Sequence, residues 1–203
     1  HDAIAQLAAV SLVPYVTSMR ASVEAPIRRL PLPAAVALRA WAHGWPRVDR
    51  WLGRPEVIHG TNYVVPPSRA ARVVSVYDCW FLDHPEDALP DVRRAAAVLR
   101  RAVGEGAHVV TSSDATSRRA RELLDTDRVR TILLGPPRVE APPAERPAAL
   151  PRLDEGPFIL SLSTIERRKN VPALVRAFAR LAHEHASVRL VIAGASGNDA
   201  GAV

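Results

Sequence analysis

The stretch that decides the fold is Gly156-Pro-Phe-Ile-Leu-Ser-Leu-Ser-Thr-Ile-Glu-Arg-Arg-Lys-Asn170. It begins with an apolar run at residues 158–162, which predicts a short buried strand. Asn170 and Pro172 come after the polar part, and these residue types are favoured at a helix N-cap and in a first helical turn. Apolar side chains then recur at helical spacing: Val171, Leu174, Val175, Phe178, Leu181 and Ala182. The sequence therefore predicts a strand, a short polar loop and an amphipathic helix.

The polar loop carries three cations in a row, Arg167, Arg168 and Lys169, and Lys169 is the sole lysine of the chain. A loop at the carboxyl end of a strand is where open α/β sheets bind ligands. The start of a helix favours anions, and Arg and Lys add fixed positive charge. The loop is therefore predicted to bind a phosphate or diphosphate. A surface loop that is merely solvated would carry such charges too.

The rest of the chain alternates strands with helices and contains a proline-rich interruption. A second loop, residues 194–201, is rich in glycine and follows a predicted strand at 188–193. We expect it beside the cationic loop, at the same sheet edge. The remaining predicted strands are residues 13–17, 57–60, 72–78, 107–111 and 129–134, the predicted helices are residues 1–12, 33–43, 91–103 and 113–124, and an irregular loop is predicted at 79–90. The predicted organisation is one lobe at residues 1–135, a linker at 136–156, and the start of a second lobe at 157–203.

Two segments resemble glycosyltransferase family 4. Ser-Thr-Ile-Glu-Arg-Arg-Lys-Asn-Val at residues 163–171 resembles the G-T-x-E-P-R-K-N loop of that family, and Arg72-Val-Val-Ser-Val-Tyr-Asp78 with the Asp83-His-Pro-Glu86 segment resembles its V-H-D-L…H-P-E segment. The resemblance implies an α/β chain of two Rossmann-like, doubly wound parallel-sheet lobes (the GT-B architecture), both incomplete here. It also implies a retaining enzyme that uses a nucleoside-diphosphate sugar as donor, with no cofactor and no metal.

The same resemblance assigns roles to residues. Arg168 and Lys169 would be catalytic, stabilising the departing diphosphate, and Ser163, Thr164 and Gly194 would complete the donor site. On the other lobe, Thr61, Asn62, Tyr77 and Asp78 would face the sugar or acceptor. Tyr77 stands where the family has a histidine, and Ser163 stands where it has a glycine. The family's paired-glutamate motif is not found in this chain, so the chain is expected to be a segment of a longer enzyme.

Composition and net charge restrict the binding partners and the cellular compartment that the chain can have. The formal net charge is +6, which suits nucleic acid, an anionic membrane surface or a phosphorylated substrate. The single cysteine, Cys79, excludes an internal disulfide and indicates a reducing compartment, so we expect a cytoplasmic protein, or one at the inner face of the membrane. Residues 26–56 are rich in Trp, Arg and Pro, and either touch a membrane interface or acceptor, or pack a helix onto the sheet.

Three alternatives to the active enzyme stay open. The chain could be an inactive fragment, a non-catalytic phosphate- or nucleotide-binding domain, or a basic nucleic-acid-binding protein. Aromatic residues do not interleave with the arginines in the strand segments, which disfavours the last class. The expected partners are a nucleotide-sugar donor and a glycan, lipid-linked or small-molecule acceptor, with no nucleic acid.

Overall fold

The protein is described by a computed structural model that covers residues 9–136 and 156–202. The chain forms two compact units, residues 1–137 and 138–203. Most of the helix predicted at residues 1–12 and most of the predicted linker, 137–155, lie outside the described residues. Residues 9–12, which are described, are not helical.

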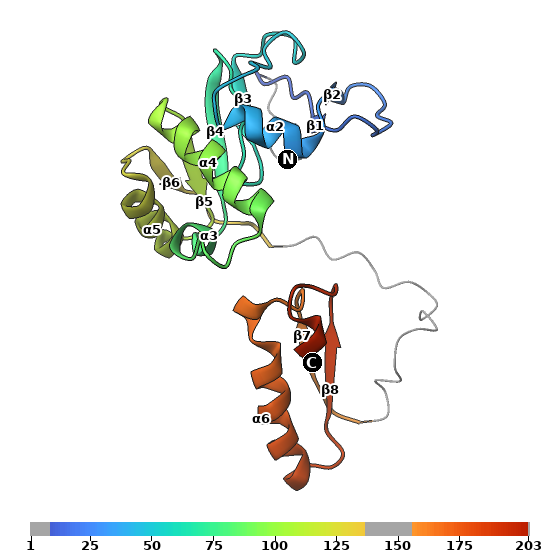
Figure 1. The fold of residues 1–203 in the computed structure, drawn as a ribbon. Helices are drawn as coiled ribbons and strands as arrows, with labels where there is room; N and C mark the ends of the chain where they lie inside the picture. Colours follow the sequence, from blue (N-terminus) through green and yellow to red (C-terminus); the bar gives the residue numbers. More distant parts are fainter. Residues whose placement is uncertain (1–8, 137–155, 203) are drawn as a thin grey trace. The chain divides into compact units, whose positions relative to one another are not determined.

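Unit 1 is built on a four-stranded parallel sheet (Figure 1). The strands run in the order β3-β4-β5-β6, and every neighbouring pair is parallel. Its elements are β1 (Tyr15–Thr17), β2 (Arg28–Leu30), α2 (Ala34–Trp41), β3 (Val57–Gly60), β4 (Ala71–Val76), α3 (Trp80–Asp83), α4 (Pro90–Gly104), β5 (His108–Thr111), α5 (Asp114–Leu124) and β6 (Val129–Thr131). Since a parallel crossover needs a connection of a dozen or more residues, α4 and α5 take that place between consecutive strands.

The core of unit 1 lies between this sheet and its helices. Val74, Val109 and Val129 are register partners on adjacent strands, and all three are buried. Side chains of α4, among them Leu99 at 0% exposure, join the same hydrophobic cluster. Burial of apolar side chains is the main force that holds helix and sheet together, at about 1.5–3 kcal/mol for each large one.

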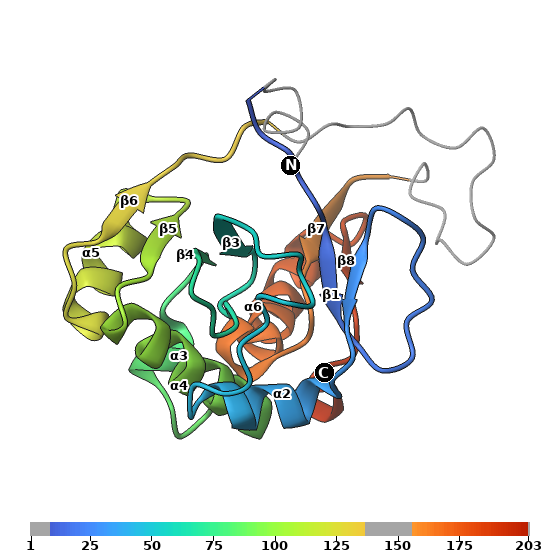
Figure 2. The ribbon, with the colours of Figure 1, turned by 90° about the horizontal axis from the view of Figure 1, so that it is seen from above.

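Helix α2 packs beside α4 (Figures 1 and 2). Ala37 and Trp41 of α2 are buried, whereas Trp45 is 73% and Trp51 is 39% exposed. The expectation that the tryptophans pack a helix onto the core is therefore confirmed for Trp41 and wrong for Trp45 and Trp51. The chain turns at residues 42–44 after α2, and Trp45 lies outside the core with its ring largely exposed.

Several boundaries differ from the sequence predictions. Residues 79–90 are not wholly irregular, because α3 forms at Trp80–Asp83, where the backbone N–H of Trp80 donates to Asp78 Oδ1 at 3.1 Å. β6 ends at Thr131 rather than at residue 134, although the N–H of Ile132 still donates to the Thr111 carbonyl. Val92, in the first turn of α4, is 36% exposed, whereas Val98, Leu99, Ala102 and Val103 farther along the helix are buried.

Unit 2 repeats the strand–helix–strand plan on a smaller scale. It contains β7 (Phe158–Leu162), the 3-10 turn η1 (Arg167–Lys169), α6 (Val171–Glu184), β8 (Arg189–Ala193) and a second 3-10 turn, η2 (Ala200–Ala202). β7 and β8 pair in parallel over five residues, and α6 is the crossover between them. The predicted strands and helix of this unit form, but the prediction that the strand at residues 158–162 is buried is wrong, because Phe158, Ile159, Leu160 and Leu162 are 41%, 41%, 53% and 76% exposed. Only Val171 of the predicted apolar stripe is fully buried, since a two-stranded sheet gives one helix little to pack against.

The described part of the chain is thus mixed α/β with parallel sheets, as the alternation of strands and helices predicted. In this part of the chain no helix is both long enough and apolar enough to cross a lipid bilayer.

Candidate functional site

The candidate site of unit 2 is formed by the two loops that follow β7 and β8. Hydrogen bonds between them continue the strand pairing beyond the sheet: Ser163 N–H donates to the Ala193 carbonyl at 3.0 Å, and Ile165 N–H donates to the Ala195 carbonyl at 3.1 Å. The backbone N–H of Arg167 also donates to Asn198 Oδ1 at 3.1 Å. The prediction that the cationic loop and the glycine-rich loop lie side by side at one sheet edge is confirmed.

Gly194 permits this close approach. A Cβ atom placed on Gly194 would lie 2.0 Å from the Ser163 carbonyl oxygen, a distance that no real side chain tolerates. Its φ of +156° also falls in a region that residues with side chains rarely adopt. Glycine at this position is therefore required by the packing of the two loops. The role of Gly194 in binding a donor stays a prediction.

The three cations occupy the 3-10 turn η1, directly before α6. Asn170 lies between the two elements in the left-handed conformation, with φ 49° and ψ 42°, and its side chain makes no capping hydrogen bond. Asn170 therefore takes the predicted N-cap position of α6, but without the side-chain hydrogen bond that usually favours asparagine there. Asparagine tolerates the left-handed region better than most residues, and here that conformation redirects the chain from the 3-10 turn into α6. Pro172 does occupy the first turn of α6, as predicted.

Arg168 is not an isolated cation. Its Nε lies 2.8 Å from Glu166 Oε2, and both side chains are about one-third exposed. An ion pair at that exposure contributes little to stability, about 0–1 kcal/mol, so an incoming anion can share or displace the carboxylate. Lys169 is exposed, and its backbone N–H donates to the Glu166 carbonyl at 2.9 Å. Arg167 is also exposed, as expected.

The cations of η1 lie at the end of α6 where the helix dipole disfavours positive charge. The N-terminus of α6 carries a partial positive charge, and cations beside it are less favourable than anions would be. Arg168 and Lys169 thus add to the positive potential of the helix end instead of compensating it. An anion placed there would interact favourably with the side chains and with the helix dipole.

In unit 1 the predicted residues follow two adjacent strands of the sheet. Thr61 and Asn62 are exposed and come directly after β3, and Tyr77 and Asp78 come directly after β4. Because β3 and β4 are parallel neighbours, these four residues lie at the same carboxyl edge. Asp78 also has a structural task, since it accepts the hydrogen bond from Trp80 N–H that starts α3.

Tyr63 is the residue at this edge that the sequence analysis missed. Its hydroxyl donates to Asp78 Oδ2 at 3.3 Å, and its ring packs edge-on against Tyr77, with centroids 6.0 Å apart. It also packs against Phe81 at 5.0 Å. The left-handed φ of 60° at Tyr63 is held by its N–H bond to the Ser75 carbonyl. The local sequence offers no periodic signal for Tyr63, and only its position after a small polar turn could have suggested it.

His59 lies on β3 and is paired with Ser75 of β4. Its Nε2 is 2.9 Å from Ser75 Oγ, and burial lowers the pKa of the imidazole, which favours the neutral ring. Ser75 is 8% exposed, and Tyr15 hydroxyl donates to the His59 carbonyl at 3.4 Å. The Tyr15 hydrogen bond ties β1 to β3, and the buried hydroxyl of Ser75 is not an accessible nucleophile.

Among residues 9–136 and 156–202 no group of three or more His, Cys, Asp or Glu side chains is arranged to hold a metal ion. The carboxylate pair Asp125-Thr126-Asp127 follows α5 and precedes β6, which places it at the amino end of the strand. That edge is opposite to the one that carries Tyr77 and Asp78, because the strands are parallel. The pair is therefore not part of the candidate site.

Comparison of the chain with protein families, with curated proteins and with solved structures returns no match.

Proposed function

We propose that the chain is part of a retaining glycosyltransferase that takes a sugar from a nucleoside-diphosphate donor and has the GT-B plan of two Rossmann-like lobes. In this proposal unit 2 binds the diphosphate of the donor, and the carboxyl edge of the unit 1 sheet faces the transferred sugar or the acceptor. The acceptor would be a glycan, a lipid-linked compound or a small molecule. The observation that carries the proposal is the cationic 3-10 turn at the start of α6, beside two loops locked together by Gly194.

Transfer of a sugar from a diphosphate donor requires positive charge beside the leaving group. When the sugar departs, negative charge grows on the diphosphate oxygen, and fixed cations aimed at that oxygen lower the barrier. The guanidinium of Arg168 can donate to two oxygens at once, and the ammonium of Lys169 acts as a compact charge. Glu166 holds Arg168 in place before the donor binds, at the cost of competing for the same guanidinium.

Ser163 and Thr164 would add a hydroxyl or backbone donor next to the cations. Both stand at the end of β7, where the chain leaves the sheet. The backbone N–H of Ser163 is already used by the Ala193 carbonyl. Its hydroxyl is therefore the group that the proposal assigns to the ligand.

On unit 1 the proposal gives Tyr77 and Asp78 the contacts with the sugar or acceptor, and Thr61 and Asn62 a place at the rim. Tyr77 is 43% exposed, so its hydroxyl is accessible. Tyr63 would position Asp78 through the hydrogen bond between its hydroxyl and the carboxylate. No cofactor or metal has a role in this proposal.

The test is titration of the full chain with UDP, GDP and ADP by calorimetry. Lys169→Ala and Arg168→Ala should each weaken binding of the preferred nucleotide by roughly tenfold, the effect of one charged hydrogen bond at a partly exposed site. Arg176→Ala removes the same charge from the exposed side of α6 and is the matched control. Equal affinities of the Lys169 and Arg176 variants would remove the diphosphate assignment.

A nucleotide-binding module without transferase activity is the second candidate, and the Arg168–Glu166 ion pair favours it because one of the two cations is partly neutralised. The two candidates differ in product formation. Incubation with UDP- and GDP-sugars and an acceptor mixture, followed by detection of released nucleoside diphosphate, separates a transferase from a binding module.

A further inference from the structure

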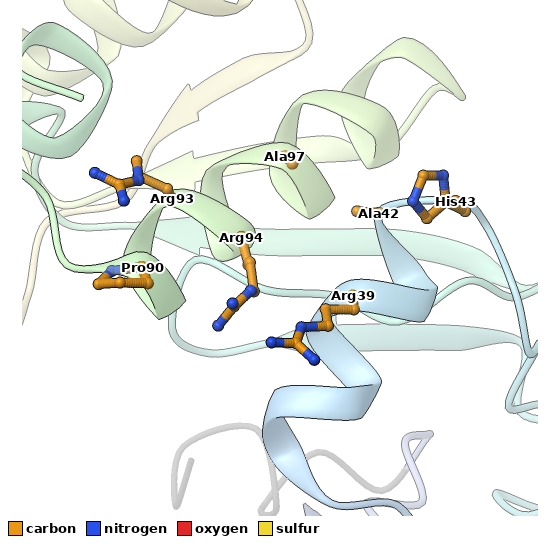
Figure 3. Close-up of a pocket in the computed structure, with 7 residues that line it drawn as sticks. All are labelled: Arg39, Ala42, His43, Pro90, Arg93, Arg94 and Ala97. Atoms are coloured by element: carbon orange, nitrogen blue, oxygen red, sulfur yellow. The ribbon is translucent and has the colours of Figure 1, made fainter. Parts of the chain in front are cut away.

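A pocket of about 340 Å³ lies between α2 and α4 in unit 1 (Figure 3). It is lined by Arg39, Ala42, His43, Pro90, Arg93, Arg94 and Ala97. Three arginines from two helices line this opening, but in Figure 3 the guanidinium of Arg93 extends away from those of Arg39 and Arg94. The small side chains of Ala42 and Ala97 leave space between the helices. In Figure 3 the guanidinium groups of Arg39, from α2, and Arg94, from α4, extend toward each other.

The charges in this pocket are not balanced. Arg94 forms an ion pair with Asp91 one turn earlier on α4. Arg39 and Arg93 are exposed, and neither forms an ion pair with any residue in the described part of the chain. Like charges that face each other across a gap repel, and arginines are commonly arranged in this way where they bind a phosphate or carboxylate.

The backbone adds to the same potential. Pro90 lines the pocket and occupies the first turn of α4, a helix of 15 residues. The positive end of the helix dipole therefore lies at the pocket, together with the guanidinium groups. His43 lines the other end of the opening, apart from the guanidinium groups.

We propose that the pocket between α2 and α4 binds a phosphate-bearing group through Arg39 and Arg94. The planar guanidinium groups suit a tetrahedral oxyanion, and the volume holds a phosphate with a small organic portion against Ala42, Ala97 and Pro90. The ligand is the phosphate of a soluble compound or the headgroup of an anionic lipid, since both present the same chemistry. The site is separate from the candidate diphosphate site, which lies in unit 2, and it does not depend on the proposed glycosyl transfer.

The experiment is a titration of the full ¹⁵N-labelled chain with inorganic pyrophosphate, with sodium chloride at matched ionic strength as the control for screening. The readout is the chemical shift of the backbone amides of Ala42 and Ala97, which reports this pocket and not the loop that carries Lys169. A parallel arm measures co-sedimentation with vesicles of phosphatidylcholine alone and of phosphatidylcholine with phosphatidylglycerol.

Saturable shifts with pyrophosphate identify a soluble phosphate ligand, and binding to the phosphatidylglycerol vesicles alone identifies a lipid headgroup. In either case Arg39→Gln and Arg94→Gln should each weaken binding by roughly tenfold, because each removes one charged hydrogen bond. Arg118→Gln removes an exposed arginine from α5 and should bind as the parent does. The proposal is overturned if neither probe binds, or if the Arg118 variant loses as much affinity as the Arg39 and Arg94 variants.

Discussion

Replacement of Gly194 by alanine should separate the two loops of unit 2 while unit 1 stays folded. The new Cβ would lie 2.0 Å from the Ser163 carbonyl oxygen and 2.5 Å from the Ser163 carbonyl carbon. Both atoms belong to the backbone, so no side-chain rotation can relieve the contact. The end of β7 must move by more than an ångström, and the hydrogen bonds from Ser163 and Ile165 to the second loop are then lost.

The cost follows from these contacts. A residue with a side chain held at this φ costs about 1–3 kcal/mol, and each of the two lost backbone hydrogen bonds costs about 1 kcal/mol, which together give about 3–5 kcal/mol. A unit of residues 138–203 is expected to have a free energy of unfolding of about 3–10 kcal/mol. The substitution should therefore remove a large share of the stability of unit 2.

The assay has to observe unit 2 alone. All four tryptophans lie in unit 1, so their fluorescence during guanidinium unfolding reports unit 1 and should not change. Amide hydrogen exchange at Ser163 and Ile165 reports the contact between the loops, and the Gly194→Ala variant should lose protection at both amides. Gly201→Ala is the matched control, because a Cβ at Gly201 meets no heavy atom within 4 Å. If both variants keep the protection of the parent chain, the close approach of Gly194 to Ser163 is refuted.

Two further predictions concern unit 1. Ser117 is the middle of a chain of hydroxyl groups, with its Oγ 2.6 Å from Thr111 Oγ1 and 2.7 Å from Thr131 Oγ1. Ser117→Ala should therefore lower the free energy of unfolding, followed by tryptophan fluorescence, by about 1–3 kcal/mol. Ser112 is less buried, so Ser112→Ala should change it by less than about 0.5 kcal/mol, and equal effects of the two variants would contradict the network. Burial raises the pKa of the Cys79 thiol to about 11, so iodoacetamide at pH 8 should label Cys79 far more slowly in the folded chain than in guanidinium. The free energy of unfolding should decrease as the pH rises past the unfolded thiol pKa of about 8.5, because only the unfolded chain ionises there. Rapid labelling of the folded chain would show that the thiol is not buried.

Much of the local structure could be predicted from the sequence. Apolar spacing located α4 and α6, and Ser113 marked the start of α5, where its Oγ accepts the backbone N–H of Thr116 at 3.2 Å. Such signals act within one or two turns of chain, so a sequence displays them completely. The strand at residues 158–162 and the loop at 194–201 could be placed at one edge for the same reason, because parallel strands bring their carboxyl ends together.

Other features could not be predicted locally. The short helix α3 depends on the carboxylate of Asp78 and on burial of Phe81 and Leu82, which only the folded unit provides. Asn170 had the residue type of an N-cap, but the 3-10 turn before α6 placed it in the left-handed region. Tyr63 approaches Asp78 because β3 and β4 are paired, a contact between residues 15 positions apart.

The sequence alone determined the alternation of strands and helices and the three consecutive cations, since each is a property of neighbouring residues. Tertiary structure alone decided that Glu166 pairs with Arg168, that Gly194 touches Ser163, and that Arg39 of α2 faces Arg94 of α4. The physical reason is that charges and close contacts act through space. Their partners are therefore set by how strands and helices pack, and not by the order of residues along the chain.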